Sequence, residues 1–422
     1  MLALTNARLF DGRTMLPGRH SVFLEGNRIA AIDEVSGVEL KKRIDLNGMT
    51  LMPGLISSHL HPDFYKYTFE NFARGEQLGK ERPPGVLTII GVRTCRVLLE
   101  SGFTGYIGAA CSNYIDPQLK MAIEEGFIPG PRILPCSHHV GTTSDANATR
   151  NWWQSFREPG IDLFGNGPNE MRKLVREEIR CGAQVIKVFA STSHAVLTDR
   201  GRRNMSRDEL AAVADTAHER GVKVRAHVCY KELILEAIEL GVDIIDHADE
   251  IDDEVIEAMV KAGSFWVPSL LFLKVGLDQK WSDSDGAIMN GYKALCRYLP
   301  VAHKAGIRIL LGDDFGVGAG PLAHEVGSYA AELLAYAEVE GVSSADILTW
   351  GTRNGGELLG KPGMAVGVVK PGALADLIVV DGDPVADLSV FARPEQTLKA
   401  VIRDGAMVID RLRSAGSRTP AE

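Results

Sequence analysis

The sequence predicts an α/β protein in which a (β/α)8 TIM barrel carries a small β-sandwich domain built from both chain termini. Three observations support this fold class. Short apolar segments recur eight times along the middle of the chain, with a helical pattern between successive segments. Most of these helical patterns end in glycine, which readily adopts the left-handed conformation that stops a helix. The two ends of the chain are instead rich in β-forming residues separated by turn signals.

The eight apolar segments are the expected barrel strands. In chain order they cover residues 51–61, 103–110, 132–139, 184–190, 223–229, 243–248, 264–270 and 308–314. Glycines precede most of them, at Gly102, Gly182, Gly221, Gly241, Gly263 and Gly306. One intervening helix begins with the capping box Ser206-Arg-Asp-Glu209. Such strand–helix units predict a barrel whose chemistry lies at the carboxyl ends of its strands. A doubly wound open sheet is the rival fold, but it would need a glycine-rich phosphate loop after the first strand, and the sequence has none.

The flanking regions predict the second domain. We expect residues 1–54 and 360–412 to form the β-sandwich together, residues 55–359 to form the barrel, and residues 413–422 to be a disordered tail. The flanking turn signals are Asp11-Gly12, Glu25-Gly26, Asn47-Gly48, Lys370-Pro-Gly372, Asp381-Gly-Asp-Pro384 and Asp404-Gly405. Residues 144–169, with two tryptophans and several Gly and Pro, are predicted to be a long loop after the third strand, over the active site.

Composition excludes several classes of function. The 422 residues carry a net charge of -9 and no Lys/Arg stripe, which argues against binding nucleic acid or an anionic membrane. The amino-terminal residues lack the basic and apolar regions of a signal peptide, and no apolar run approaches the ~20 residues that span a bilayer. The six cysteines are scattered, which argues against a disulfide framework or a cysteine zinc site. We therefore expect a soluble cytoplasmic protein.

The pair His59-Leu60-His61 is the most informative local feature of the chain. It ends the first apolar segment. Side chains alternate between the two faces of a strand, so both imidazoles project the same way. Two neutral imidazoles on one strand end are suitable ligands for zinc and similar divalent ions. The pair therefore predicts a metal site.

Further candidate ligands end other predicted strands. His139 ends the third strand, His227 the fifth, His247 the sixth and Asp314 the eighth. The carboxyl ends of all barrel strands meet at one rim, so we expect these side chains to converge there. His138 neighbours His139 but should face the opposite side of its strand. The convergence predicts one metal centre.

Lys187 lies inside the otherwise apolar fourth strand, where an unpaired ammonium group would carry a large desolvation cost. One interpretation is a lysine that extends its amine to solvent or pairs with a carboxylate. The second is a lysine that reacts with CO2 to form a carbamate, which would bridge two metal ions at the barrel centre.

The segment Pro53-Gly-Leu-Ile-Ser-Ser-His-Leu-His61 resembles the first-strand signature of the metal-dependent amidohydrolase superfamily. Lys187, His227, His247 and Asp314 follow in that superfamily's order, and residues 370–384 resemble its carboxyl-terminal β-sandwich segment. The resemblance covers essentially the whole chain. Within the superfamily the chain is most similar to the imidazolonepropionase-like and Xaa-Pro-dipeptidase-like branch, which includes carboxypeptidase-type and bacterial ochratoxin-degrading amidohydrolases.

The resemblance implies a centre of two divalent ions, with zinc favoured. One ion would be bound by His59, His61 and Asp314, the second by His227 and His247, and carboxylated Lys187 would bridge them. The eighth-strand motif departs from the family's Gly-Thr-Asp, because Gly312-Asp313-Asp314 has an acid in place of threonine. Asp314 is the expected ligand by register, and Asp313 stays an alternative.

The resemblance also implies roles in catalysis and substrate binding. Asp314 would take the proton of a metal-bridging hydroxide, His139 would contact the scissile carbonyl, and Tyr230 would contact a substrate carboxylate. His194 follows the fourth strand, so it is a further candidate for the pocket. The other histidines are expected to be structural and Cys229 to line the pocket wall; these histidines are His20, His138, His218, His303 and His324.

The expected function is hydrolysis of an amide bond to a carboxylate-bearing amino acid. The substrate would be ochratoxin A, cleaved to ochratoxin alpha and phenylalanine, or a substrate of the carboxypeptidase or dipeptidase type. The alternative is a cyclic amidase of the hydantoinase or dihydroorotase type. A deaminase is less favoured, because mononuclear deaminases generally lack the carbamylated lysine. A non-catalytic scaffold would have lost ligands that are all present here. The branch also implies a homo-oligomer, with an octamer expected.

Overall fold

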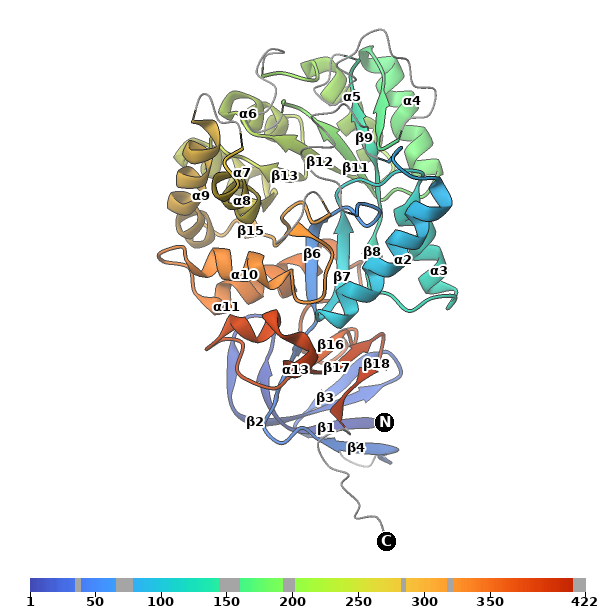
Figure 1. Ribbon diagram of the computed structural model, residues 1–422, viewed down its shortest axis with the longest axis vertical. Helices are drawn as coiled ribbons and strands as arrows, with labels where there is room; N and C mark the ends of the chain where they lie inside the picture. The colour runs from blue at the N-terminus through green and yellow to red at the C-terminus, as the bar shows by residue number, and fades with distance from the viewer. Residues whose placement is uncertain are drawn as a thin grey trace.

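The computed structural model describes residues 1–34, 39–65, 79–143, 160–192, 202–281, 286–316 and 322–412. It confirms the predicted fold class: a parallel α/β body lies above a β-rich part that contains strands from both ends of the chain (Figure 1). Among these residues no helix is both long and apolar enough to cross a membrane.

The β-rich part is one sheet of eight strands in the order β18-β17-β16-β5-β1-β2-β3, with β4 paired to β1. The two ends of the chain join where β5 runs antiparallel to β16, with Leu51 opposite Val379. The strands are β1 (Leu2–Phe10), β2 (Met15–Glu25), β3 (Arg28–Ile32), β4 (Lys42–Asp45), β5 (Thr50–Pro53), β16 (Leu377–Val380), β17 (Leu398–Arg403) and β18 (Ala406–Asp410).

Each of the eight apolar segments contains a strand of the parallel body. These strands are β6 (Leu55–Leu60), β7 (Phe103–Gly108), β8 (Arg132–Leu134) with β9 (Cys136–Gly141), β11 (Val185–Phe189), β12 (Lys223–Val228), β13 (Ile244–His247), β14 (Phe265–Val267) and β15 (Arg308–Ile309). Each glycine that was expected to end a helix has positive φ.

The first segment was expected to be one strand, but it divides at Gly54 into β5 of the β-rich sheet and β6 of the barrel. A Cβ atom at Gly54 would lie 2.1 Å from the Thr104 side chain, so only glycine fits where the chain passes between the two sheets. The segment 264–270 is also shorter as a strand than expected, because Leu270 begins helix α8.

The barrel closes between the first and the eighth strand. Leu60 forms a parallel bridge with Phe315, and the Ser58 N–H donates to the Leu311 carbonyl at 2.6 Å. The third strand is interrupted at Pro135, which has no N–H to donate to the ladder. The parallel strands therefore form two sheets, β6-β7-β8 and β10-β9-β11-β12-β13-β14-β15.

The predicted loop 144–169 was too long. Strand β10 (Asp162–Phe164) pairs in parallel with β9, and helix α4 begins at Gly167. Residues 144–159 and the expected tail 413–422 lie outside the described residues.

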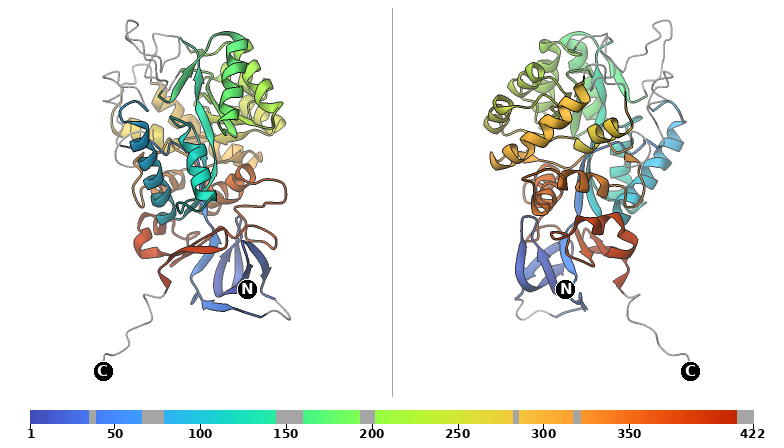
Figure 2. Two further views of the ribbon diagram at one scale, coloured as in Figure 1. Left: turned by 90° about the vertical axis from the view of Figure 1, so that its right-hand side faces the viewer. Right: turned by 60° about the vertical axis from the view of Figure 1, so that its left-hand side comes forward.

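Helices surround the strands on the outside of the body (Figures 1 and 2). The predicted capping box is present at the start of α5, where the Ser206 side chain accepts from the Glu209 N–H. The helices are α2 (Pro84–Glu100), α3 (Ile115–Glu124), α4 (Gly167–Arg180), α5 (Arg207–His218), α6 (Lys231–Glu239), α7 (Asp253–Ala262), α8 (Leu270–Asp278), α9 (Ala287–Lys304), α10 (Ala330–Ala337), α11 (Ser344–Thr349), α12 (Gly355–Leu359) and α13 (Pro394–Thr397).

A buried carboxyl group ties helix α3 to two strands and predicts a pH-dependent stability. Asp116 accepts hydrogen bonds from the Tyr106 hydroxyl at 2.9 Å and the Cys136 N–H at 3.0 Å. Burial raises the pKa of Asp116 from 3.8 to about 7, outweighing these hydrogen bonds. A raised folded-state pKa means that this group's contribution to stability is full below pH 4 and falls as the pH rises to about 7.

We expect Asp116→Asn to gain stability relative to the wild type as the pH rises from 5 to 7. The asparagine amide can replace the protonated acid, and the relative gain should be of the order of 2 kcal/mol. Urea unfolding at several pH values measures it, with the exposed Asp208→Asn as the control. A difference in unfolding free energy that does not change with pH would contradict the expectation.

Candidate metal centre

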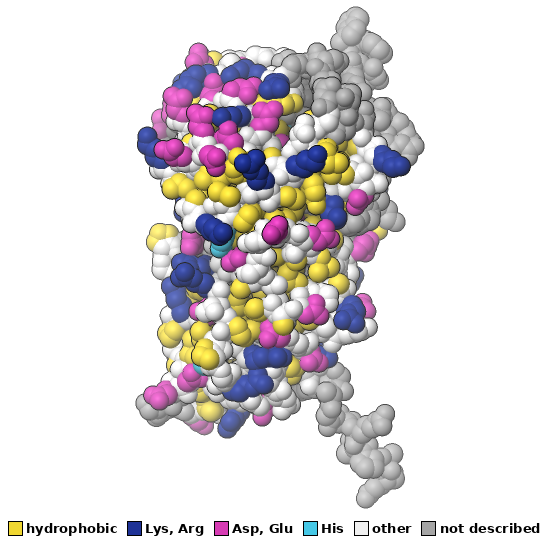
Figure 3. Space-filling view, turned by 90° about the vertical axis from the view of Figure 1, so that its left-hand side faces the viewer, with side chains coloured by type: hydrophobic (Ala, Val, Ile, Leu, Met, Phe, Trp, Pro, Cys, Tyr) yellow, Lys and Arg dark blue, Asp and Glu magenta, His cyan; other side chains and the backbone are white. Residues whose placement is uncertain are grey.

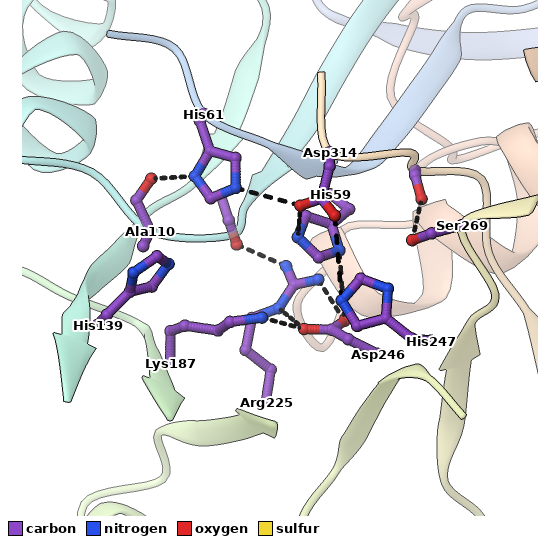
Figure 4. Close-up of polar contacts among 12 residues, drawn as sticks. His59, His61, Ala110, His139, Lys187, Arg225, Asp246, His247, Ser269 and Asp314 are labelled. Carbon is purple, nitrogen blue, oxygen red and sulfur yellow. Dashed lines mark hydrogen bonds and ion pairs between the residues drawn. The ribbon is translucent and has the colours of Figure 1, made fainter. Parts of the chain in front are cut away.

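Three of the predicted ligands meet at the carboxyl end of the barrel. His59 near the end of β6 and His61 just after it both point toward Asp314, which follows β15 (Figure 4). The Asp314 Oδ1 atom lies 2.5 Å from His59 Nε2 and 3.4 Å from His61 Nε2. One ligand atom from each residue lies within 4.8 Å of those of the other two. This geometry suits a divalent ion.

The structure separates the two acids of the eighth-strand motif. Asp314 adopts φ of 53° and faces the histidines. Asp313 is buried in the opposite direction, where it accepts from the Phe272 N–H at 3.3 Å and contacts Glu332 of α10. Of the two alternatives, Asp314 has the position of a ligand.

The histidines of β12 and β13 lie beside this group. The rings of His227 and His247 are 4.5 Å apart between centroids, and His247 Nε2 is 4.0 Å from Asp314 Oδ2. His247 has φ of 69°, and its carbonyl accepts from the Trp266 indole at 2.9 Å. His227 stacks on Phe189 with 4.4 Å between ring centroids. The structure thus places a second imidazole pair next to the first.

Lys187 is buried below the histidines and pairs with a carboxylate, as one interpretation of the sequence expected. Its Nζ lies 2.5 Å from Asp246 Oδ2. Asp246 also accepts two hydrogen bonds from Arg225, at 2.6 and 3.1 Å. All three side chains are at most 1% exposed. The positive charges of Arg225 and Lys187 outweigh the effect of burial and hold the pKa of Asp246 well below its usual range.

His139 lies at the same end of the barrel, with 5.9 Å between its ring centroid and that of His61. Its Nδ1 is 3.1 Å from Asp162 Oδ1 on β10. A carboxylate at Nδ1 favours the tautomer with the proton on that nitrogen and orients the ring. Burial lowers the pKa of His139 well below 6.5, so the imidazole is neutral near pH 7.

The protonation states near pH 7 suit metal binding. Burial lowers the pKa of His59 to about 4, so this imidazole is neutral and can act as a ligand. Burial would raise the pKa of Asp314, but His59 and the hydrogen bonds of both neighbouring histidines hold it well below 3.8. The centre therefore offers a neutral imidazole at His59 and a carboxylate at Asp314.

The expected substrate contacts are only partly described. Tyr230 precedes α6 at the same end of the barrel and is half-buried, with the Arg202 guanidinium 4.7 Å from its ring centroid. Cys229 is buried beside the centre, with its Sγ 3.5 Å from His227 Nε2. His194 lies outside the described residues.

The histidines that were expected to be structural pair away from the centre, with one exception. His138 faces helix α4 and lies 3.0 Å from Glu178. The exception is His324, whose Nε2 is 2.9 Å from the carbonyl oxygen of His61, so it supports a candidate ligand directly. The remaining pairs are His20 with Asp33, His218 with Asp243 and His303 with Asp346.

Sequence reasoning missed three residues: Arg225, Asp246 and Asp162. Arg225 stands two residues before His227 in an apolar strand, so the desolvation argument that singled out Lys187 applies to it equally. Asp246 directly precedes His247 and is likewise a charged residue in an apolar strand, so the same desolvation argument applies to it. Asp162 carries no local signal, because it follows the long segment 144–159 and only the pairing of β10 with β9 brings it to His139.

Comparison with known proteins decides the family. Residues 50–408 match the sequence model of the Amidohydrolase family. The chain belongs to this family. It is therefore a metal-dependent hydrolase of C–N bonds, and the group of His59, His61 and Asp314 is its candidate metal site.

Individual proteins that resemble this chain support the family assignment. The chain is 28% identical to ochratoxinase of Aspergillus niger over 380 residues, which cover 82% of this chain and 73% of that protein. A crystal structure of a prolidase complexed with N-methylphosphonate-L-proline matches with a TM-score of 0.81 and 26% identity, over 97% of this chain and 99% of the prolidase. The A. niger ochratoxinase structure matches with a TM-score of 0.83 over 97% of this chain and 95% of that one, and at 22% identity it supports the fold alone.

Proposed function

We propose that this amidohydrolase cleaves an amide bond to a carboxylate-bearing amino acid at a centre of two divalent metal ions, with zinc as the expected metal. The observation that carries the proposal is the convergence of His59, His61 and Asp314 at the barrel rim, with a second histidine pair beside them. The similarity to a prolidase and to ochratoxinase supports the substrate class.

The imidazoles of His59 and His61 and the carboxylate of Asp314 are the kinds of ligand that a divalent metal ion such as zinc takes. In the proposal His59, His61 and Asp314 would hold one ion, His227 and His247 would hold the second, and Lys187 would be a further ligand as a carbamate. His59 Nδ1 is buried and makes no hydrogen bond, and Asp246 Oδ1 lies 3.7 Å from it. A ligating imidazole usually gives its second N–H to such a carboxylate, so this orientation suits ligation through Nε2.

Each protein group then has a task. Bound ions would supply a nucleophile from water at neutral pH and polarise the amide carbonyl. Asp314, held as a carboxylate, accepts the proton of the attacking water and passes it to the leaving amine. His139, oriented by Asp162, contacts the scissile carbonyl group. Tyr230 contacts the substrate carboxylate.

A substrate screen tests the proposal. Zinc-loaded enzyme is assayed with N-acyl amino acids, Xaa-Pro dipeptides, ochratoxin A and hydantoins. We expect hydrolysis in one or more of the first three groups and none of the hydantoins. Cleavage confined to hydantoins would replace the proposal with a cyclic amidase.

His139→Ala is expected to lower turnover by ~100-fold or more while the metal content stays unchanged, because its role is in the reaction and not in ligation. Metal analysis and single-substrate kinetics measure the two effects. His138→Ala is a matched control, because His138 is the adjacent residue and pairs with Glu178 outside the barrel. Equal turnover in the two variants would remove His139 from the reaction.

We also propose that the chain forms a homo-oligomer, for which the family resemblance implies an octamer. Apolar side chains are exposed on α7, α9 and α10, at Val260, Met289, Val301 and Leu334. Figure 3 shows apolar side chains gathered across the middle of the face to which these helices belong. Light scattering of the purified protein measures its mass, and a monomer at all concentrations would contradict the proposal.

A further inference from the structure

We infer that Arg225 is a positioning residue of the metal centre, because its guanidinium group holds together the strand ends that carry the ligands. This inference rests on the proposed metal centre. Arg225 is fully buried on β12, two residues before His227, so both side chains point into the barrel. Figure 4 shows its guanidinium below His59 and His61 and beside Asp246.

The first observation is the set of hydrogen bonds that this group donates. One terminal nitrogen donates to the carbonyl of Ser58 at 2.9 Å and to that of Gly108 at 2.6 Å. The Nε and the other terminal nitrogen donate to the two oxygens of Asp246. A single planar group therefore joins β6, β7 and β13 across the barrel to its own strand.

The second observation is where these partners lie in the sequence. Ser58 directly precedes His59, and Asp246 directly precedes His247. Gly108 lies two residues before Ala110, whose carbonyl is 3.0 Å from His61 Nδ1. Each acceptor of an Arg225 hydrogen bond is thus within two residues of a proposed metal ligand, or of a residue that contacts a proposed metal ligand.

The third observation is that strand pairing is irregular in this region. The β6–β7 ladder loses its regular register between Ser57 and Leu60, which is where Arg225 bridges the two carbonyls. Closure with the eighth strand consists of the isolated bridge of Leu60 and Phe315 and a few backbone hydrogen bonds, such as that from the Ser58 N–H to the Leu311 carbonyl. The Arg225 guanidinium adds hydrogen bonds to the Ser58 and Gly108 carbonyls where the pairing is irregular, which satisfies these buried carbonyls and limits the movement of His59.

The fourth observation concerns Asp246. This carboxylate is shared by Arg225 and Lys187 and lies 3.7 Å from the unbonded His59 Nδ1. If Lys187 turns to the metals as a carbamate, Asp246 would be a buried charge without a partner unless another cation stayed with it. Arg225 is that cation, and its two-pronged contact fixes the plane of the carboxylate next to His59.

The test compares zinc affinity in Arg225→Met, Arg225→Lys and Arg132→Met, together with the melting temperature of each metal-free protein. Arg132 is the matched control, since it makes a similar two-pronged contact with the buried Asp376, at 2.9 and 3.3 Å, near the β-rich sheet. Competition with a chelator measures zinc affinity, and metal analysis measures the ions bound per chain.

We expect Arg225→Met to weaken zinc binding by ~10- to 100-fold, the range typical for residues that orient ligands. Arg225→Lys keeps the positive charge but lacks the planar guanidinium group, so we expect a smaller loss of zinc affinity. Arg132→Met should lower the melting temperature without weakening zinc binding. If Arg225→Met does not fold, Arg225→Lys decides the question by the same comparison.

Three results would overturn the inference. Wild-type zinc affinity in both Arg225 variants would leave the proposed function intact and limit Arg225 to packing. An equal loss of affinity in Arg132→Met would show a general effect of instability. A wild-type protein that binds no zinc would overturn the proposed function and this inference together.

Discussion

Lys187→Ala is expected to bind less than one zinc ion per chain and to lose at least ~1000-fold in turnover. In the proposed centre Lys187 is the bridging ligand, and alanine leaves nothing in its place between the two histidine pairs. Loss of a bridge affects both ions, and with them the nucleophile and the polarised carbonyl. Metal analysis and amide hydrolysis measure the two losses in parallel.

Lys223→Ala is the control for this substitution. Lys223 begins the neighbouring strand β12, is partly exposed and pairs with Asp243 at 3.1 Å. Its loss should leave metal content and turnover unchanged. Partial recovery of Lys187→Ala by added acetate is also expected, because a small carboxylate fits the space of the missing carbamate. Two bound ions with near wild-type turnover in Lys187→Ala would end the carbamate proposal.

Asp314→Asn should lower turnover by ~100- to 10,000-fold, the range for loss of a general acid–base group, and should weaken binding of one ion. The adjacent Asp313→Asn should stay within several-fold of the wild type. Burial raises the pKa of Asp313 to about 7, so asparagine resembles its protonated form. The two variants differ by one position in the chain, and kinetics with metal analysis compares them directly. A larger defect in Asp313→Asn would reverse the assignment.

The local pattern of the sequence predicted much of this molecule. Alternation of side chains along a strand placed His59 and His61 on the same face, and glycines with a capping box marked helix ends. The desolvation cost of a charge in an apolar strand singled out Lys187, and its partner is a buried carboxylate, Asp246. These predictions depend only on residues close together in the chain, so no knowledge of the fold was needed.

Residue type and period thus determined which side chains point into the barrel, but not which of them touch. The tertiary structure alone decided that Asp314 faces the histidines while Asp313 turns to Glu332, that Asp162 orients His139, and that Arg225 binds carbonyls of β6 and β7. The tertiary structure also divided the first apolar segment, residues 51–61, into strands β5 and β6 at Gly54. These contacts depend on strand register and on closure of the barrel, which bring together groups as far apart in the chain as His59 and Asp314.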